Sequence, residues 1–286
     1  MTIDERAVAR ALWAVTEPLH SSVYFGTQHA AAMKQLGMRG YWMGYFASRS
    51  APLGPAPVPV VSAVFYPFRP SMVARALPDA WSYASPQEVL AARLAATEAA
   101  LADVDEAELA ALADLLVPAA EAADCAGRPL AAANQGLGAP GSAAGRLWWA
   151  ATVLREHRGD GHVAALVTHG VGRLEALALA APDGSQREMQ RVNRGWSEED
   201  WEAAVGGLRE RGLLSADGTA LTTAGRELVD AVEAATDAAA AGAWPATGRR
   251  DIYDRARAIS ERLVGPVVPL VNPVGNPWPP PDLPTS

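Results

Sequence analysis

The densest group of chemically reactive side chains in this sequence runs from Arg155 to His162, in the stretch LREHRGDGHVAAL. Two arginines can bind an anion or a carbonyl oxygen, and two histidines can transfer protons near neutral pH. The interpretation without chemistry is a helix that ends near Arg158 and a Gly-Asp-Gly turn, in which Asp160 caps the following helix. From the sequence alone both interpretations stay open.

If this stretch is a site, its residues divide between catalysis and ligand binding. We predict three catalytic residues and two ligand-binding residues in it: His157, His162 and Asp160, then Arg155 and Arg158. The two arginines are three positions apart, so they share one face of a helix. The three catalytic candidates could also hold a metal ion with a further ligand, such as His20 or His169. Their spacing is not an established ligand pattern, so a metal-dependent enzyme is only a second alternative, and the sequence identifies no cofactor.

A second polar and aromatic cluster occurs in the N-terminal half, in the stretches PLHSSVYF and GYWMGYFASRSAPLG. Aromatic residues at helical spacing commonly form part of a core. An arginine directly before a Pro-Gly turn, however, needs a partner if it is buried. Polar points inside an aromatic pocket are typical of a small-molecule site. We therefore predict five ligand-binding residues here: His20, Tyr24, Trp42, Tyr45 and Arg49.

Length and composition limit the class of protein. The chain has 286 residues, half of them hydrophobic, and nine tryptophans, which suffices for one large or two smaller domains. Its single cysteine excludes an internal disulfide. The first residues do not resemble a signal peptide, and no run approaches the roughly 18 apolar residues that span a bilayer. We expect a cytoplasmic protein without a membrane segment.

The net charge of −8 is concentrated in one region. From Ser85 to Cys125 there are nine acidic residues, and Arg93 is the only basic one. Such a run of like charge usually forms the solvated face of helices, so we predict no function from it.

Hydrophobic periodicity predicts helices along most of the chain. In the N-terminal half the expected helices cover residues 4–20, 27–36 (with Thr27 as N-cap), about 38–48, 85–102 and 105–123. The stretch VPVVSAVFYPF, residues 58–68, is expected to be a buried helix, with a strand as the alternative. A Gly- and Pro-containing stretch at 127–145 is the best linker candidate. A helix then leads to the Gly-Asp-Gly turn, and another begins near Gly161.

Residues 197–244 have the order of elements found in a winged helix. Ser197 is expected to cap a helix with Trp201, Val205 and Leu208 on its core face. A short strand, the turn SADGT and a returning strand would form a small β-wing. The motif LTTAG would then begin a long helix, capped by Thr222 or Thr223. This pattern resembles the winged-helix half of MarR-type regulators over about residues 163–244.

The charge of this segment argues against a strong DNA interaction. The expected recognition-helix region, residues 195–212, has five acidic residues and two arginines, a net charge of −3, and the wing has no basic residue. Phosphate neutralisation by lysine and arginine dominates DNA affinity. The credible phosphate contacts are Arg187, Arg191 and Arg194 on the preceding helix. DNA is therefore a disfavoured partner.

Taken together, the two polar clusters resemble an actinobacterial family of helix-turn-helix proteins, over about residues 12–244. The resemblance implies a fold and a setting in specialised metabolism, and it brings no catalytic residues that can be transferred to this chain.

The sequence therefore predicts a mainly α protein with a helical N-terminal domain (1–135), a winged-helix-like C-terminal domain with a small β-wing (140–263) and an extended Pro-rich tail (264–286). The predicted function is small-molecule binding in a pocket between the two domains, with the winged helix as a scaffold and enzyme activity left open. The alternative is a MarR-like, ligand-responsive DNA-binding regulator. A homodimer is the expected assembly in that alternative.

Overall fold

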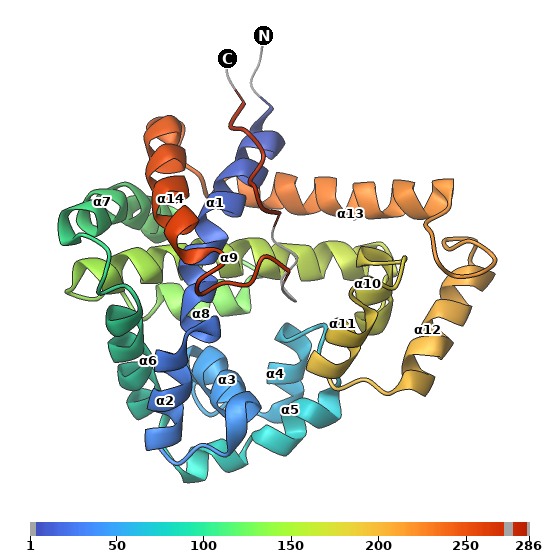
Figure 1. The fold of residues 1–286 in the computed structure, drawn as a ribbon, viewed down its shortest axis with the longest axis horizontal. Helices are drawn as coiled ribbons and strands as arrows, with labels where there is room; N and C mark the ends of the chain where they lie inside the picture. The colour runs from blue at the N-terminus through green and yellow to red at the C-terminus, as the bar shows by residue number, and fades with distance from the viewer. Residues whose placement is uncertain (1–3, 272–276, 285–286) are drawn as a thin grey trace. The chain divides into compact units, whose positions relative to one another are not determined.

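The computed structural model describes residues 4–271 and 277–284, and within them the chain is mainly helical (Figure 1). These residues contain fourteen α-helices and two short 3-10 helices. They divide into two compact units: the first comprises Met1–Ala56, Ala76–Asp160 and Asp237–Ser286, and the second comprises Pro57–Arg75 and Gly161–Thr236. The prediction of a mainly α protein is confirmed.

The first unit contains nearly all of the longer helices of the N-terminal half. Its helices are α1 (Glu5–Phe25), α2 (Thr27–Gln35), α3 (Gly40–Ser50), η1 (Ala51–Leu53), η2 (Asp79–Ser82), α6 (Pro86–Ala100), α7 (Glu106–Ala122), α8 (Pro129–Gln135) and α14 (Arg249–Leu263). It also includes the first part of α9 (Ala143–Thr168) and the end of α13 (Thr223–Ala241).

The second unit is built from shorter helices. They are α4 (Val58–Val64), α5 (Pro70–Ala76), α10 (Arg173–Ala180), α11 (Arg187–Asn193) and α12 (Glu198–Glu210), together with the end of α9 and most of α13. Helices α9 and α13 thus contribute residues to both units, and α5 ends on Ala76, the first residue of the next segment of the first unit.

The core of the first unit follows from the apolar spacing of α1. Val8, Leu12, Val15 and Leu19 lie on one helix face and are at most 2% exposed. They pack in one cluster with α7, α9 and α14. Ser260 of α14 adds a hydrogen bond from its hydroxyl to the carbonyl of Val15 at 2.7 Å, so the helix pair is fixed by both apolar and polar contacts.

Local sequence signals set most helix starts. Asp4 caps α1 by accepting from the backbone of Arg6 at 3.0 Å. Ser85 and Glu88 form a reciprocal capping box on α6. The predicted N-cap Thr27 is wrong by one position, because Gly26 is the cap and Thr27 is the first helical residue.

The expected helix at 58–68 is present as the shorter α4. It ends at Val64, because the backbone of Phe65 leaves helical angles, with φ at −90° and ψ at 51°.

The predicted break at the Gly-Asp-Gly sequence does not exist. Helix α9 runs without interruption from Ala143 to Thr168, so Gly159, Asp160 and Gly161 are helical. A glycine inside a helix costs about 1 kcal/mol relative to alanine. The buried residues of α9 on both sides of this point offset that cost.

The second unit begins its helix α12 as the sequence predicts. The Ser197 hydroxyl accepts from the Asp200 backbone at 3.1 Å, and the Asp200 carboxylate accepts from the Ser197 backbone at 3.0 Å. Trp201 and Leu208 are buried in the core of this unit. Thr222 caps α13 by accepting from the backbone of Gly225 at 3.0 Å.

The predicted β-wing is wrong for the described chain, where no strand occurs. An isolated antiparallel bridge joins Leu214 and Leu221. The backbone hydrogen bonds from Ser215 to Ala220 (2.8 Å) and from Thr222 to Leu213 (3.1 Å) flank it. The chain therefore reverses here as a tight turn, because the arms on either side of it are too short to extend the ladder.

Residues 127–145, the predicted linker, contain α8 and lie within the first unit. The described part of the Pro-rich tail has no helix, and residues 277–284 lie against α14. The Tyr253 hydroxyl donates to the carbonyl of Pro281 at 2.9 Å, and Leu283 joins the apolar core of this unit. The predicted domain boundaries themselves stay a prediction.

In the part of the chain that the structure describes, no single helix is long and apolar enough to cross a membrane.

The turn before α13 leaves no room for a side chain at Gly225. A Cβ atom built there would lie 2.1 Å from the carbonyl oxygen of Leu213. We expect Gly225→Ala to lower the free energy of unfolding by about 1–3 kcal/mol, since the backbone must shift. Denaturant unfolding measures this change.

Gly206 on α12 provides the matched control, because nothing lies within 4 Å of a Cβ built there. Gly206→Ala should be neutral or stabilise by up to about 1 kcal/mol through helix propensity. Equal effects of the two alanines would contradict the role assigned to Gly225.

Candidate functional site

Helix α9 places a carboxylate, Glu156, in the interior of the first unit, where it is 1% exposed. Arg49 of α3 binds both of its oxygens, from Nε and Nη2, each at 2.9 Å. Arg155 donates from Nη1 to Oε2 at 2.8 Å. Burial alone would raise the pKa of Glu156, but the two guanidinium groups hold that pKa well below its ordinary value. Glu156 is therefore an ionised carboxylate inside the protein.

A second buried carboxylate, Glu17 of α1, lies beside this pair. Its Oε2 accepts from the indole of Trp13 at 3.0 Å and lies 3.5 Å from Nε of Arg155. Its Oε1 has no hydrogen-bond partner among the described residues. Burial raises the pKa of Glu17 despite the charge of Arg155. Glu17 thus has more tendency than an exposed glutamate to hold a proton.

His20, one turn further along α1, is held by contacts to α9. Its Nδ1 lies 3.0 Å from the hydroxyl of Thr152, and its carbonyl accepts from the indole of Trp148 at 3.1 Å. The imidazole stacks on the Trp148 ring with centroids 6.0 Å apart. Burial, followed by the charge of Arg155, holds the pKa of His20 well below 6.5. The ring is neutral at physiological pH.

Aromatic side chains of α1 and α3 cover this region. Tyr24 contacts His20 and Tyr45, with ring centroids 5.3 Å apart in each pair. Tyr45 also lies 3.4 Å from Nη1 of Arg49 through its hydroxyl. Trp42 packs edge-to-face on Tyr45 at 5.6 Å and is only partly buried. The predicted aromatic cluster is therefore continuous with the Arg49–Glu156 pair.

Arg93 of α6 brings a third buried guanidinium group to the same interior. It is 4% exposed, donates from Nη1 to the carbonyl of Ser48 at 2.9 Å, and lies over the Trp148 ring at 4.8 Å. Among the described residues it forms no ion pair, unlike Arg49 and Arg155. Burial lowers the pKa of Arg93, which reflects the desolvation of this cation.

Polar atoms near Arg93 are buried without partners. Both ring nitrogens of His29 on α2 and the hydroxyl of Ser48 on α3 make no hydrogen bond to any described residue, although His29 is 1% and Ser48 0% exposed. Burial and the charge of Arg93 lower the pKa of His29 to about 4. Each unsatisfied buried polar group costs about 1–3 kcal/mol, so this is an unusual local concentration.

Arg93, but neither His29 nor Ser48, lines a cavity of about 300 Å³. Arg93, Trp148 and Trp149 line it together with Leu90, Ala91, Leu94 and residues 137–140. A volume of this size lies at the lower end of the range for small-molecule sites. Its walls are mainly apolar and aromatic, and Arg93 is the charged residue in them.

We refer to the charged and polar residues of this interior as the buried polar centre. It consists of Glu17, His20, Tyr24, His29, Tyr45, Ser48, Arg49, Arg93, Arg155 and Glu156. The structure brings five of the predicted ligand-binding residues into it and places Trp42 at its edge.

Sequence reasoning missed Glu17, His29, Arg93 and Glu156. A signal for Arg93 was present, because it is the only basic residue among nine acids between Ser85 and Cys125. An acidic helix face that is exposed to solvent does not require an arginine on the opposite face of the same helix. The partners of Glu156 could not be found from spacing, since Arg49 lies 107 positions away.

Three predicted residues of α9 have contacts elsewhere in the first unit. His157 places Nε2 3.1 Å from the carbonyl of Asp124. Arg158 binds Asp237 at 2.9 Å and lies over the Trp13 ring at 4.1 Å. Asp160 accepts from the backbones of Leu130 and Ala131, at 2.9 and 3.0 Å. Asp160 thus caps a helix as its residue type suggests, but the helix is α8 and not the one predicted.

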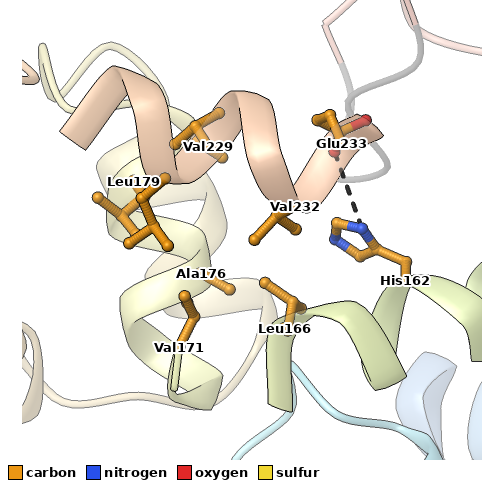
Figure 2. A pocket seen from close by; sticks show the side chains of 10 residues that line it. His162, Leu166, Val171, Ala176, Leu179, Val229, Val232 and Glu233 are labelled. Carbon is orange, nitrogen blue, oxygen red and sulfur yellow. Dashed lines mark ion pairs between the residues drawn. The ribbon is translucent and has the colours of Figure 1, made fainter. Parts of the chain in front are cut away.

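The remaining catalytic candidate, His162, belongs to the second unit and borders a small apolar cavity of about 90 Å³ (Figure 2). Its Nδ1 lies 2.9 Å from the Thr236 hydroxyl and 3.8 Å from a carboxylate oxygen of Glu233. The Thr236 hydroxyl donates its only proton to the carbonyl of Val232. Nδ1 of His162 must therefore carry a proton and donate to Thr236.

These positions separate the three residues of the metal alternative. His157, Asp160 and His162 each have different neighbours, and no group of three or more His, Cys, Asp or Glu residues in the described chain is placed to hold a metal ion. The catalytic roles predicted for the three residues remain predictions.

In the second unit, arginines of α11 form ion pairs with acidic residues of α11 and α12. Arg187 of α11 pairs with both Glu198 and Glu202 of α12. Arg191 lies 3.1 Å from Glu198 and 2.8 Å from Glu188. These are two of the three arginines predicted to contact phosphate.

The second unit as a whole also carries a negative net charge. It contains nine arginines and twelve acidic residues, a net charge of −3. The first turn of α12 holds three acids, Glu198, Glu199 and Asp200. The helix N-terminus that would approach phosphates in a winged helix is therefore negative.

The model of a family described as "Helix-turn-helix family" matches residues 9–268 of the chain. No curated protein and no solved structure matches it.

Removal of the central carboxylate should destabilise the first unit. Glu156→Ala leaves Arg49 buried without its bidentate partner, and breaking a buried pair from one side costs about 3–5 kcal/mol. Denaturant unfolding measures the loss. Glu121→Ala, at an exposed position of α7, is the control and should change stability by less than about 0.5 kcal/mol. A loss below about 1 kcal/mol for Glu156→Ala would contradict this role.

The stability of the protein should depend on pH through Asp160. Burial, followed by the charge of Glu156, raises its pKa from 3.8 to about 6. The folded state therefore binds this proton more tightly than the unfolded state does. The resulting stabilisation is complete below about pH 4 and is lost as the pH rises through about 6, a full change of about 3 kcal/mol.

Asp160→Asn tests this pH dependence because the amide stays neutral and keeps an oxygen for capping α8. In the wild type, Asp160 should raise the unfolding free energy at about pH 4.5 by about 2 kcal/mol relative to about pH 7.5. In the variant this contribution should be absent. An identical pH profile for the two proteins would show that Asp160 does not titrate in this range.

Proposed function

The chain belongs to the helix-turn-helix family, and from that premise we propose that it binds a small molecule in its first unit and uses the helix-turn-helix part as a scaffold. The observation that carries the proposal is the buried polar centre. Three guanidinium groups and two carboxylates lie in an interior that also contains unsatisfied polar atoms and borders a cavity of about 300 Å³.

Stability alone does not account for such a group. Burying ions costs several kcal/mol each, and an apolar core of the same volume is often at least as stable. Unsatisfied polar atoms add to that cost. Titratable groups with shifted pKa values beside a cavity are typical of functional sites. A bound molecule that supplies the missing hydrogen-bond partners would offset these costs.

The charges of the second unit support the scaffold part of the proposal. A DNA-binding helix needs arginines or lysines that are free to neutralise phosphates. Arg187 and Arg191 are engaged by acids, and the start of α12 would repel the phosphate backbone. Fold alone does not decide function, so this surface weighs more than the name of the family.

A native mass spectrum of untagged protein from its own host, beside a denatured spectrum, tests the binding function. We expect an additional mass in the native spectrum that disappears on denaturation, since a ligand held in the interior survives purification. An apo mass, together with salt-dependent and sequence-specific DNA binding, would overturn the proposal.

Family membership is compatible with DNA binding, and we propose as the second candidate a MarR-like regulator in which the same first-unit site binds an effector. This function requires a homodimer that places two copies of α12 about one DNA turn apart, roughly 34 Å. It also requires DNA affinity that falls with rising salt.

A charge variant separates the two candidates. Replacing Glu198 and Glu202 by glutamine releases Arg187 and reduces the negative charge at the start of α12. If this charge prevents DNA binding, the double variant should gain at least about tenfold in non-specific DNA affinity at low salt over a wild type that binds weakly.

The control makes the same change of charge in the first unit, by Asp103→Asn and Glu121→Gln, and should leave DNA affinity unchanged. Tight DNA binding by the wild type, weakened by the α12 variant, would favour the regulator.

A further inference from the structure

Arg93 differs from the other buried arginines of the first unit in its partners. Arg49 and Arg155 share the carboxylate of Glu156, so each of them has an anionic partner within the protein. Arg93 is at least as deeply buried as Arg49, but its partners are the Ser48 carbonyl at 2.9 Å, the Asn134 side-chain oxygen at 3.5 Å, the nearby Tyr24 hydroxyl and the face of Trp148. A buried guanidinium group normally has an anionic partner, and here the described residues supply none within ion-pair distance.

Hydrogen-bond donors surround this cation. Ser48 carries the carbonyl bound by Arg93, and its own hydroxyl is unsatisfied. His29 is close enough for the charge of Arg93 to lower its pKa, and its two ring nitrogens also have no hydrogen-bond partner among the described residues. Tyr24 lies near both His29 and Arg93. Its ring centroid is 5.3 Å from that of His29, and its hydroxyl offsets part of the desolvation of Arg93. The four residues come from α1, α2, α3 and α6, which pack together.

The type of these groups identifies the missing partner. A permanent cation, a hydroxyl and a neutral imidazole are all able to donate to oxygen. The nearest ionised carboxylate, Glu156, is already bound by two arginines. A compact oxyanion would therefore supply Arg93 with the anionic partner that these neighbours do not provide.

The cavity next to Arg93 defines the rest of the ligand. Its walls include Trp148, Trp149, Leu90 and Leu94, and its volume is about 300 Å³. Arg93 and Trp148 line the cavity and also contact each other, so the charged and apolar parts are contiguous. Such walls favour an apolar or aromatic body over a sugar or a polyphosphate.

We infer that the first unit binds an apolar carboxylic acid, with the carboxylate held by Arg93 and the apolar body in the cavity lined by Trp148 and Trp149. This inference rests on the proposed small-molecule function and names its ligand class.

The test is calorimetric titration of the full-length protein with three carboxylates, benzoate, 3-phenylpropanoate and octanoate, and with 3-phenylpropanamide as the uncharged analogue. We expect at least one carboxylate to bind with one-to-one stoichiometry. The amide should bind at least about tenfold more weakly than its acid, because it loses the charge-assisted hydrogen bonds.

Variants locate the site without depending on a single buried residue. Ala91 is exposed on α6 and lines the cavity, so Ala91→Leu should fold normally and reduce carboxylate affinity at least about tenfold by filling the space. Ala95, exposed one turn later on the same helix and not part of the cavity wall, is the control, and Ala95→Leu should bind as the wild type does. Arg93→Gln, where folded by circular dichroism, should remove the preference for acid over amide.

Equal affinity for acid and amide, or no effect of Ala91→Leu, would overturn the inference. Failure of all three carboxylates to bind, in a protein whose native mass spectrum shows another ligand, would also overturn it and leave the proposed function standing. A ligand-free native mass with specific DNA binding would reject the proposed function itself.

Discussion

The carboxylate of Glu156 joins three helices of the first unit through charge. It lies on α9, receives two hydrogen bonds from Arg49 of α3, and shares Arg155 with Glu17 of α1. A charge in this position is tolerated only with such partners, because the desolvation of an isolated carboxylate would exceed what packing returns. The orientation of Arg49, and with it the aromatic side chains of α3, depends on this one residue.

Charge is distributed differently in the two units. The first unit buries part of its charge, with Arg49 and Arg155 paired with Glu156 and a third arginine, Arg93, that has no carboxylate partner among the residues described. In the second unit, acids of α12 bind arginines of α11 in partly exposed ion pairs. Surface pairs of this kind contribute little to stability, but they engage arginines that a contact to phosphate would need.

Several elements were predictable because their causes are local. The N-caps Asp4, Ser85 and Ser197 each satisfy backbone donors within three residues, and the apolar spacing of α1 selects its buried face. The start of α13 at the motif LTTAG also has a local cause, since Thr222 caps the helix and Gly225 lies against a carbonyl of the same turn. The prediction of a β-wing was wrong because a strand requires a pairing partner of sufficient length. In this turn the chain forms a single isolated bridge.

By itself the sequence determined an α-helical chain, most helix starts and the residue types able to bind an anion. Tertiary structure decided which of those residues meet. Asp160 has the chemistry of a cap in the sequence, but α8, thirty positions away, provides the donors. Gly-Asp-Gly is typical of a turn, but packing along α9 keeps it helical. In the sequence Arg93 is one basic residue in an acidic run, and only the folded chain places it inside beside Ser48, His29 and Trp148. The reason is physical: capping and periodicity act over a few residues, whereas burial and charge pairing depend on segments that the chain brings together only when it folds.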